Sequence, residues 1–219
     1  MGTIELDKHS KQLFIYSNIL LYGNLATESL AKQCADEIET MWNEPKAIVK
    51  FKEEDYTAVF VTKGYLFSQL TPEDIFENRN PRNNYFRVEE FVHGNISFVD
   101  GLGCNTGLFK MENLYPGSTT AAHEYGHTLG LDHPADLDLR GKGVPGIMYP
   151  RGTLVDPQYQ YEPHVAAGTK GGTMHPMHRR VKQQDIDLLK LNQFNFANPQ
   201  LVIGNFSAVY HQAHNSNEA

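Results

Sequence analysis

The segment that organises this chain reads His123-Glu124-Tyr125-Gly126-His127-Thr128-Leu129-Gly130-Leu131-Asp132-His133. Residues four apart lie on one face of an α-helix, so a helix through this segment would bring His123 and His127 to one ion. Gly130 allows the backbone to leave the helix with positive φ, and the chain can then return His133 to the same ion. Three histidine ligands and a fourth position open to water are typical of catalytic zinc, whereas structural zinc usually has four protein ligands. The spacing therefore predicts a catalytic zinc site.

Glu124 follows the first predicted ligand and is not needed for coordination. Its carboxylate would face the same cleft and could take a proton from a metal-bound water, so we predict that Glu124 is the general base. At average residue frequencies the fixed positions of this pattern would recur by chance in about one chain of this length in 10⁵. The alternative is a buried, hydrogen-bonded histidine cluster or a metal site without activity.

The pattern HExxHxxGxxH resembles that of the metzincin zinc endopeptidases. Downstream, the segment Gly146-Ile147-Met148-Tyr149-Pro150 is similar to their Met-turn, in which a methionine forms an apolar floor beneath the metal. The resemblance gives Met148 this structural role, and the alternative is a methionine that fills a gap in the core.

The same resemblance implies a fold and an activity. The implied fold is α+β, with a five-stranded mixed twisted sheet and three main helices, namely one on the sheet, one at the zinc site and one at the C-terminus. The implied activity is that of a zinc-dependent endopeptidase that acts on extended protein or peptide substrates, with Glu124 as the general base. The second function class is a catalytically idle, zinc-stabilised protein-binding module, and the intact Glu124 favours the enzyme.

Features of two metzincin branches occur in the segment. Gly126, Leu129 and Leu131 resemble the matrixins, the collagenase-like branch, whereas Pro134 after the third histidine resembles the serralysins. Serralysins and astacins add a tyrosine ligand two residues beyond the methionine of the Met-turn. This chain has Pro150 at that position, so no tyrosine ligand is predicted.

The substrate pocket is predicted around and after the Met-turn. Matrixins have Pro-x-Tyr in the pocket wall, and this chain has Pro150-Arg151-Gly152, so the pocket shape is not carried over. Residues 151–180 are rich in Gly, Pro, Tyr and His, and connections of this length without regular structure are usually functional. In this position they would border the pocket, and the predicted substrate contacts are Tyr149, Pro150, Tyr159, Tyr161 and His164.

Two further segments resemble the matrixins. His93-Gly94-Asn95, followed by Asp100-Gly101, is similar to a loop that binds a second zinc and a calcium, so Asp100 is a predicted Ca²⁺ ligand. The alternative is a strand that ends in an Asp-Gly turn. Residues 181–189 are similar to the C-terminal helix, where the resemblance places Asp185 against the processed N-terminus. The alternative for Asp185 is a cap of its own helix.

Hydrophobic patterning supports the same order of elements. Residues 27–42 have apolar side chains at helical spacing, so one face of this helix should pack on a sheet. Segments rich in β-branched and aromatic residues and bounded by turn residues predict strands at 13–21, 47–51, 56–66, 85–99 and 106–111. We expect one domain over residues 1–205 and a polar, frayed tail over residues 206–219.

Composition narrows the class of partner. A chain of 219 residues with 40% hydrophobic residues can bury a substantial core. The formal net charge of −7, without a cluster of Lys and Arg, argues against nucleic acid and anionic membranes as partners. No apolar run approaches the length of about 20 residues that a bilayer span needs. We therefore expect a monomer whose partner is a protein or peptide substrate.

Cysteine usage and the first residues bear on location. Cys34 and Cys104 are too few for a disulfide framework, and they could pair or stay free. Residues 1–12 lack the apolar stretch of a signal peptide. Because an unguarded endopeptidase is hazardous in its own cytosol, we expect a secreted protein or one delivered into another cell. It would be the catalytic domain of a longer precursor, or a toxin or effector domain.

Overall fold

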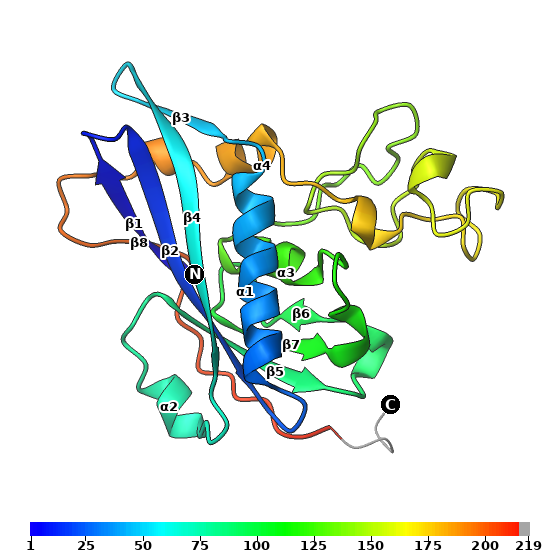
Figure 1. Ribbon diagram of the computed structural model, residues 1–219, viewed down its shortest axis with the longest axis horizontal. Helices are drawn as coiled ribbons and strands as arrows, with labels where there is room; N and C mark the ends of the chain where they lie inside the picture. Colours follow the sequence, from blue (N-terminus) through cyan, green and yellow to red (C-terminus); the bar gives the residue numbers. More distant parts are fainter. Residues whose placement is uncertain (215–219) are drawn as a thin grey trace.

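One mixed sheet forms the centre of the molecule (Figure 1). The structure is a computed structural model that describes residues 1–214, with the backbone alone at His93. Four neighbouring strands run parallel, in the order β4 (Glu54–Leu66), β2 (Gln12–Tyr22), β5 (Asn83–Glu89) and β7 (Thr106–Lys110). Antiparallel strands lie at both edges, β3 (Ile48–Phe51) beside β4 and β6 (Phe98–Val99) beside β7.

Two strands extend the sheet beyond the expected five. β1 (Gly2–Asp7) pairs antiparallel with β2, and β8 (Leu201–Ile203) pairs antiparallel with β1. The predicted strand at 85–99 is two strands, because a 3₁₀ turn at His93–Asn95 separates β5 from β6. Within the described residues the sheet therefore has eight strands. An α+β fold is confirmed in general, and the expected strand number was wrong.

Four α-helices occur within the described residues, and the longest lies across the sheet (Figure 1). Their bounds are α1 (Glu28–Asn43), α2 (Pro72–Phe76), α3 (Thr120–Thr128) and α4 (Gln183–Leu188). Thr27 caps α1, because its Oγ1 accepts a hydrogen bond from the Leu30 backbone N–H at 3.1 Å. The apolar face of α1 is buried, as its spacing predicts.

An aromatic cluster joins α1 and α3 to the sheet. The Trp42 ring of α1 lies 5.0 Å from Phe60 of β4 and 5.6 Å from Tyr125 of α3, measured between ring centroids. The Trp42 Nε1–H donates to the Ala122 carbonyl at 3.0 Å, so the buried indole is satisfied. Truncating such a residue typically costs about 3–5 kcal/mol. The cluster therefore fixes α3 with respect to α1 and β4.

The C-terminal segment contacts the rest of the molecule within its described part. The Ser207 backbone N–H donates to Asn105 Oδ1 at 2.7 Å, and Tyr210 stacks on Tyr22 with ring centroids 5.5 Å apart. His211 Nε2 lies 2.9 Å from Asp100 Oδ1. Ser207, Tyr210 and His211 thus each contact a residue outside the segment, which the expectation of a frayed tail did not anticipate. Residues 215–219 lie outside the described part.

Asp185 does not hold the N-terminus. Its Oδ2 accepts the Lys182 backbone N–H at 2.8 Å, so it caps its own helix. The Met1 ammonium instead donates to Asn84 Oδ1, and Met1 is fully buried. In this structure Asp185 therefore follows the alternative, a cap of its own helix, and its pairing with a processed N-terminus stays a prediction. Among the residues described, no helix combines the length and apolarity that crossing a membrane requires.

Candidate metal centre

The start of α3 depends on a side chain from α1. Thr119 precedes the helix with φ of 59° and provides no side-chain cap. Glu37 of α1 takes this role, because its Oε1 accepts the Ala122 backbone N–H at 3.3 Å. Burial raises the pKa of Glu37, and hydrogen bonds from the first amides of α3 oppose that rise. The metal-site helix is thus anchored at its N-terminus to the helix that covers the sheet.

The end of α3 follows the turn that the sequence predicts. The Leu131 backbone N–H donates to the Gly126 carbonyl and the Gly130 N–H to the His127 carbonyl, both at 3.0 Å. Gly130 has φ of +95°, and a Cβ there would meet nothing within 4 Å. The position therefore requires glycine for its backbone conformation rather than for space. This turn carries the chain back toward His133.

The three predicted ligands converge. Nε2 of His133 lies 3.1 Å from Nε2 of His123 and 3.1 Å from Nε2 of His127. Nitrogen ligands around a tetrahedral zinc ion are separated by about 3.3 Å, so the spacing suits such an ion. Within residues 1–214 this is the one group of three or more His, Cys, Asp or Glu side chains arranged to hold a metal.

Backbone carbonyls set the orientation of two imidazoles. Nδ1–H of His123 donates to the Ile147 carbonyl and Nδ1–H of His127 to the Leu131 carbonyl, both at 2.7 Å. These bonds favour the tautomer with the free lone pair on Nε2, the atom that faces the other two rings. Burial lowers the pKa of all three histidines, most strongly for His123. The ligands are therefore neutral near pH 7, as metal binding requires.

Met148 lies against α3 between the two helical ligands. It is buried, and the turn around it is closed by the Tyr149 N–H donating to the Gly146 carbonyl at 3.3 Å. A Cβ built on Gly126 would collide with the Met148 sulfur. The close approach therefore requires glycine at 126. A role for Met148 as an apolar floor beneath a metal stays a prediction.

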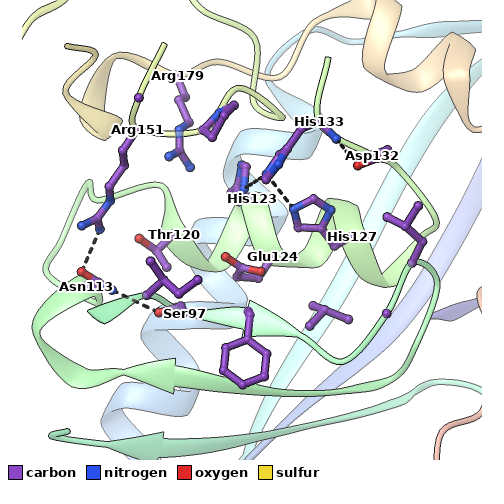
Figure 2. A pocket seen from close by; sticks show the side chains of 17 residues that line it. Ser97, Asn113, Thr120, His123, Glu124, His127, Asp132, His133, Arg151 and Arg179 are labelled. Atoms are coloured by element: carbon purple, nitrogen blue, oxygen red, sulfur yellow. Dashed lines mark hydrogen bonds between the residues drawn. The ribbon is translucent and has the colours of Figure 1, made fainter. Parts of the chain in front are cut away.

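Glu124 is buried with one unsatisfied oxygen. The residue is 5% exposed, and its Oε2 has no hydrogen-bond partner. Burial raises the pKa of this carboxyl to about 8, against the opposing effects of Arg179 and Arg151. Figure 2 shows the carboxyl facing the cavity beside the histidines. An unpartnered buried oxygen next to three converging Nε2 atoms fits a site that holds a metal ion and a water.

A cavity of about 550 Å³ opens over these residues. Of the predicted substrate contacts, Pro150 lines it, whereas Tyr149, Tyr159, Tyr161 and His164 lie outside its lining. Tyr149 and Tyr159 pack on a separate small cluster, and Tyr161 lies against His175 with ring centroids 4.5 Å apart. His164 is exposed. A role for these four side chains in substrate contact stays a prediction.

Two arginines in the cavity wall are absent from the sequence-based prediction. Arg179 is only 3% exposed, and burial lowers its pKa to about 10. Arg151 lies beside it in the lining and donates from Nη2 to Asn113 Oδ1 at 2.8 Å. No periodic pattern identifies them, because both lie in the irregular segment 151–180. Arg179 and Arg180 are adjacent, and only the fold distinguishes the buried one from the exposed one.

The predicted calcium ligand has protein partners. Asp100 Oδ2 accepts a hydrogen bond from Thr106 Oγ1 at 2.5 Å, and Oδ1 lies 2.9 Å from His211 Nε2. Calcium binding at Asp100 stays a prediction, and an ion there would compete with both contacts. The side chain of His93, part of the same implied loop, lies outside the described part of the structure.

Comparison with known proteins adds no assignment for this site. No protein-family model matches the chain, and no curated protein sequence matches it.

Proposed function

We propose that this chain is a zinc-dependent endopeptidase of the metzincin type that hydrolyses peptide bonds in extended protein or peptide substrates. The observation that carries the proposal is the unpartnered Oε2 of Glu124 beside the three converging Nε2 atoms, at the base of an open cavity. A histidine cluster with a purely structural role would leave this buried carboxyl without a function.

In the proposed reaction, the metal ligands and the general base have separate roles. His123, His127 and His133 would hold the ion, and bound zinc supplies Lewis acidity toward the scissile carbonyl and a water. Glu124 takes a proton from the attacking water and returns it to the nitrogen of the leaving amine. Burial raises the pKa of Glu124, and the charge of a bound metal ion would oppose that rise and favour the carboxylate form that a base needs.

The edge of the sheet offers a place for the substrate backbone. β6 pairs with β7 on one side and is the last strand of the sheet order. Phe98 and Val99 of β6 line the cavity together with Ser97. An extended peptide can add to such an edge through main-chain hydrogen bonds, which favours a peptide over a compact small molecule.

The test is cleavage of a diverse mixture of quenched peptides by the wild-type chain and by Glu124→Gln, with zinc content measured on both. We expect about one zinc per chain in each, and activity lower by roughly 10²–10⁴-fold in the variant, because proton transfer is lost while the ligands remain. Glu53→Gln, at a highly exposed position, is the matched control and should leave activity unchanged.

Two outcomes would contradict the proposal. Zinc in both proteins with cleavage by neither would favour the alternative, a zinc-stabilised protein-binding module. Equal cleavage by the wild type and Glu124→Gln would remove Glu124 from the mechanism.

A further inference from the structure

Arg179 carries a buried charge without a protein partner. A buried guanidinium normally has an ion pair or a full set of hydrogen bonds, because removing it from water is costly. Within residues 1–214, neither Arg179 nor Arg151 forms an ion pair with a carboxylate. The Nε of Arg179 is buried and has no hydrogen-bond partner. Among the described residues, the wall of the cavity therefore holds two guanidinium groups without a carboxylate partner, of which Arg151 has one hydrogen bond, to Asn113.

The nearest carboxylates are already engaged. Glu124 and Glu37 both act on Arg179 electrostatically. Glu37, however, accepts amide hydrogen bonds at the start of α3, and Glu124 has the role of base in the proposed reaction. The positive charge of the two arginines is thus available to a ligand.

Figure 2 shows both guanidinium groups pointing into the cavity on the side of Thr120 and Asn113. Arg151 reaches Asn113, whose Nδ2 donates to Ser97 Oγ at 3.4 Å. Ser97 immediately precedes β6, so the arginines lie at the end of the cleft where β6 begins. The chain beyond β6 lies at the other end, where the Gly103 N–H donates to the His127 carbonyl at 2.8 Å.

This placement assigns the arginines to one side of the scissile bond. Antiparallel pairing is slightly more stable per residue than parallel pairing, and a substrate added antiparallel to β6 runs opposite to it. Its C-terminal part then lies where β6 begins, beside Arg151 and Arg179. These side chains therefore face the substrate residues that follow the scissile bond.

We propose that Arg179 and Arg151 bind a substrate carboxylate on the leaving-amine side of the cleft, so that the enzyme selects an acidic residue directly after the scissile bond. This inference rests on the proposed endopeptidase function. A guanidinium binds a carboxylate through two parallel N–H···O bonds, and a desolvated pair of this kind discriminates strongly against neutral side chains.

The test has a binding arm and a cleavage arm. In the binding arm, randomised short peptides are captured on immobilised, zinc-loaded Glu124→Gln protein, and the retained peptides are sequenced by mass spectrometry. One peptide mixture has amidated C-termini and the other has free carboxylates, which separates an acidic side chain from a chain end. In the cleavage arm, the wild type digests the same mixtures and the new N-termini are identified.

We expect peptides with Asp or Glu to be enriched about tenfold or more in both mixtures, because a charge-assisted hydrogen bond contributes at least the roughly 1.4 kcal/mol that a tenfold change in affinity requires. Arg151→Gln and Arg179→Gln, each introduced into the proteins of both arms, should abolish the enrichment while zinc content stays the same. Arg180→Gln is the matched control, because Arg180 is exposed and outside the cavity lining. If Arg179→Gln fails to fold, the result for Arg151→Gln tests the proposal, because the Arg151 side chain is only partly buried and its replacement should be tolerated.

The outcomes separate the two proposals. Cleavage without acidic enrichment overturns the inference and leaves the endopeptidase intact. Acidic enrichment in the binding arm without cleavage supports the carboxylate site and overturns the endopeptidase. Enrichment that survives in both arginine variants overturns the assignment of these residues.

Discussion

At the scale of single residues, the contact between Gly126 and Met148 couples the metal-site helix to the turn below it. Met148 fills the space that a side chain at 126 would occupy, and Trp42 borders the same space at 3.2 Å from a Cβ placed there. The adjacent Ile147 carbonyl orients His123. Any displacement of the turn is therefore transmitted to a metal ligand.

Gly126→Ala should destabilise the protein by about 1–3 kcal/mol, because the methyl group would be forced against the Met148 sulfur in a closely packed region. Zinc affinity should fall as well, since the shifted turn would change the orientation of His123. Urea unfolding and zinc titration measure the two effects. Gly152→Ala is the stability control, because a Cβ at 152 meets nothing within 4 Å. Equal stabilities of the two variants would show that the turn yields freely.

Asp185 places a carboxyl between α4 and the same turn. Its oxygens accept the backbone N–H groups of Lys182 and Ile147, yet burial prevails and raises its pKa to about 6. A carboxyl whose pKa is higher in the folded state stabilises the fold below its unfolded pKa, near 4. That stabilisation is lost as the pH rises through about 6.

We therefore expect the stability of the wild type to fall relative to Asp185→Asn between pH 4 and pH 7, by roughly 2–3 kcal/mol. Denaturant unfolding across this range measures the difference. Asp187→Asn on the same helix is the matched control for the substitution, because Asp187 is exposed. If the difference in unfolding free energy between the wild type and Asp185→Asn did not change with pH, the Asp185 carboxyl would stay ionised in the folded protein.

At the scale of elements, local sequence patterns predicted individual helices and strands but not the pairing of strands that are distant in the sequence. The helix expected at 27–42 and the strands expected at 13–21 and 106–111 agree with the structure within two residues at each end. Their apolar periodicity is contained in their own sequence. β8 has only three residues, and it pairs with a strand almost two hundred positions away. No local pattern encodes such a pairing.

The residues of the cleft also divide into those that a local motif predicts and those that it does not. The three histidines and Glu124 lie in one short segment, so their spacing alone predicted that they meet. Arg151 and Arg179 come from separate parts of an irregular segment, which tertiary contacts hold in place. Thr119 Oγ1 donates to the Pro176 carbonyl at 2.8 Å, and the Arg180 backbone N–H donates to the Pro145 carbonyl at 3.0 Å. The cleft wall therefore required the tertiary structure.

The contacts of the C-terminal segment also lead to a prediction about stability. Tyr210→Ala removes the stacking on Tyr22 and a hydrogen bond to the Leu70 carbonyl, so stability should fall by about 1–2 kcal/mol. Thermal unfolding measures the change. Gln212→Ala is the control, because Gln212 is exposed in the same segment. An unchanged midpoint for Tyr210→Ala would support the expectation of a frayed tail.

At the scale of the whole molecule, the site is supported by parts that do not depend on the metal. Trp42 ties α1 to the Ala122 carbonyl, and Glu37 caps α3 from the same helix. The fold around the cleft should therefore persist when metal is withdrawn, unlike that of small zinc domains, which unfold without their ion.

Chelation should lower the unfolding midpoint by roughly 10 °C and leave the far-ultraviolet circular dichroism unchanged. Zinc at a thousandfold excess over its Kd contributes about 4 kcal/mol, and a chain of this size shifts by about 2–4 °C per kcal/mol. His133→Ala, which removes the exposed ligand, should make the midpoint much less responsive to added zinc. Loss of the circular dichroism signal on chelation would contradict the expectation.

The carbonyl bonds to Nδ1 of His123 and His127 have a consequence for competition among ions in a cell. Copper binds nitrogen donors more tightly than zinc does, so affinity alone would favour the wrong ion. Because the Ile147 and Leu131 carbonyls hold both rings, moving the donors into the square-planar array that copper(II) prefers would cost these hydrogen bonds. The fixed arrangement of the three imidazoles would then disfavour copper, and loosening either carbonyl contact should raise the affinity for copper relative to zinc.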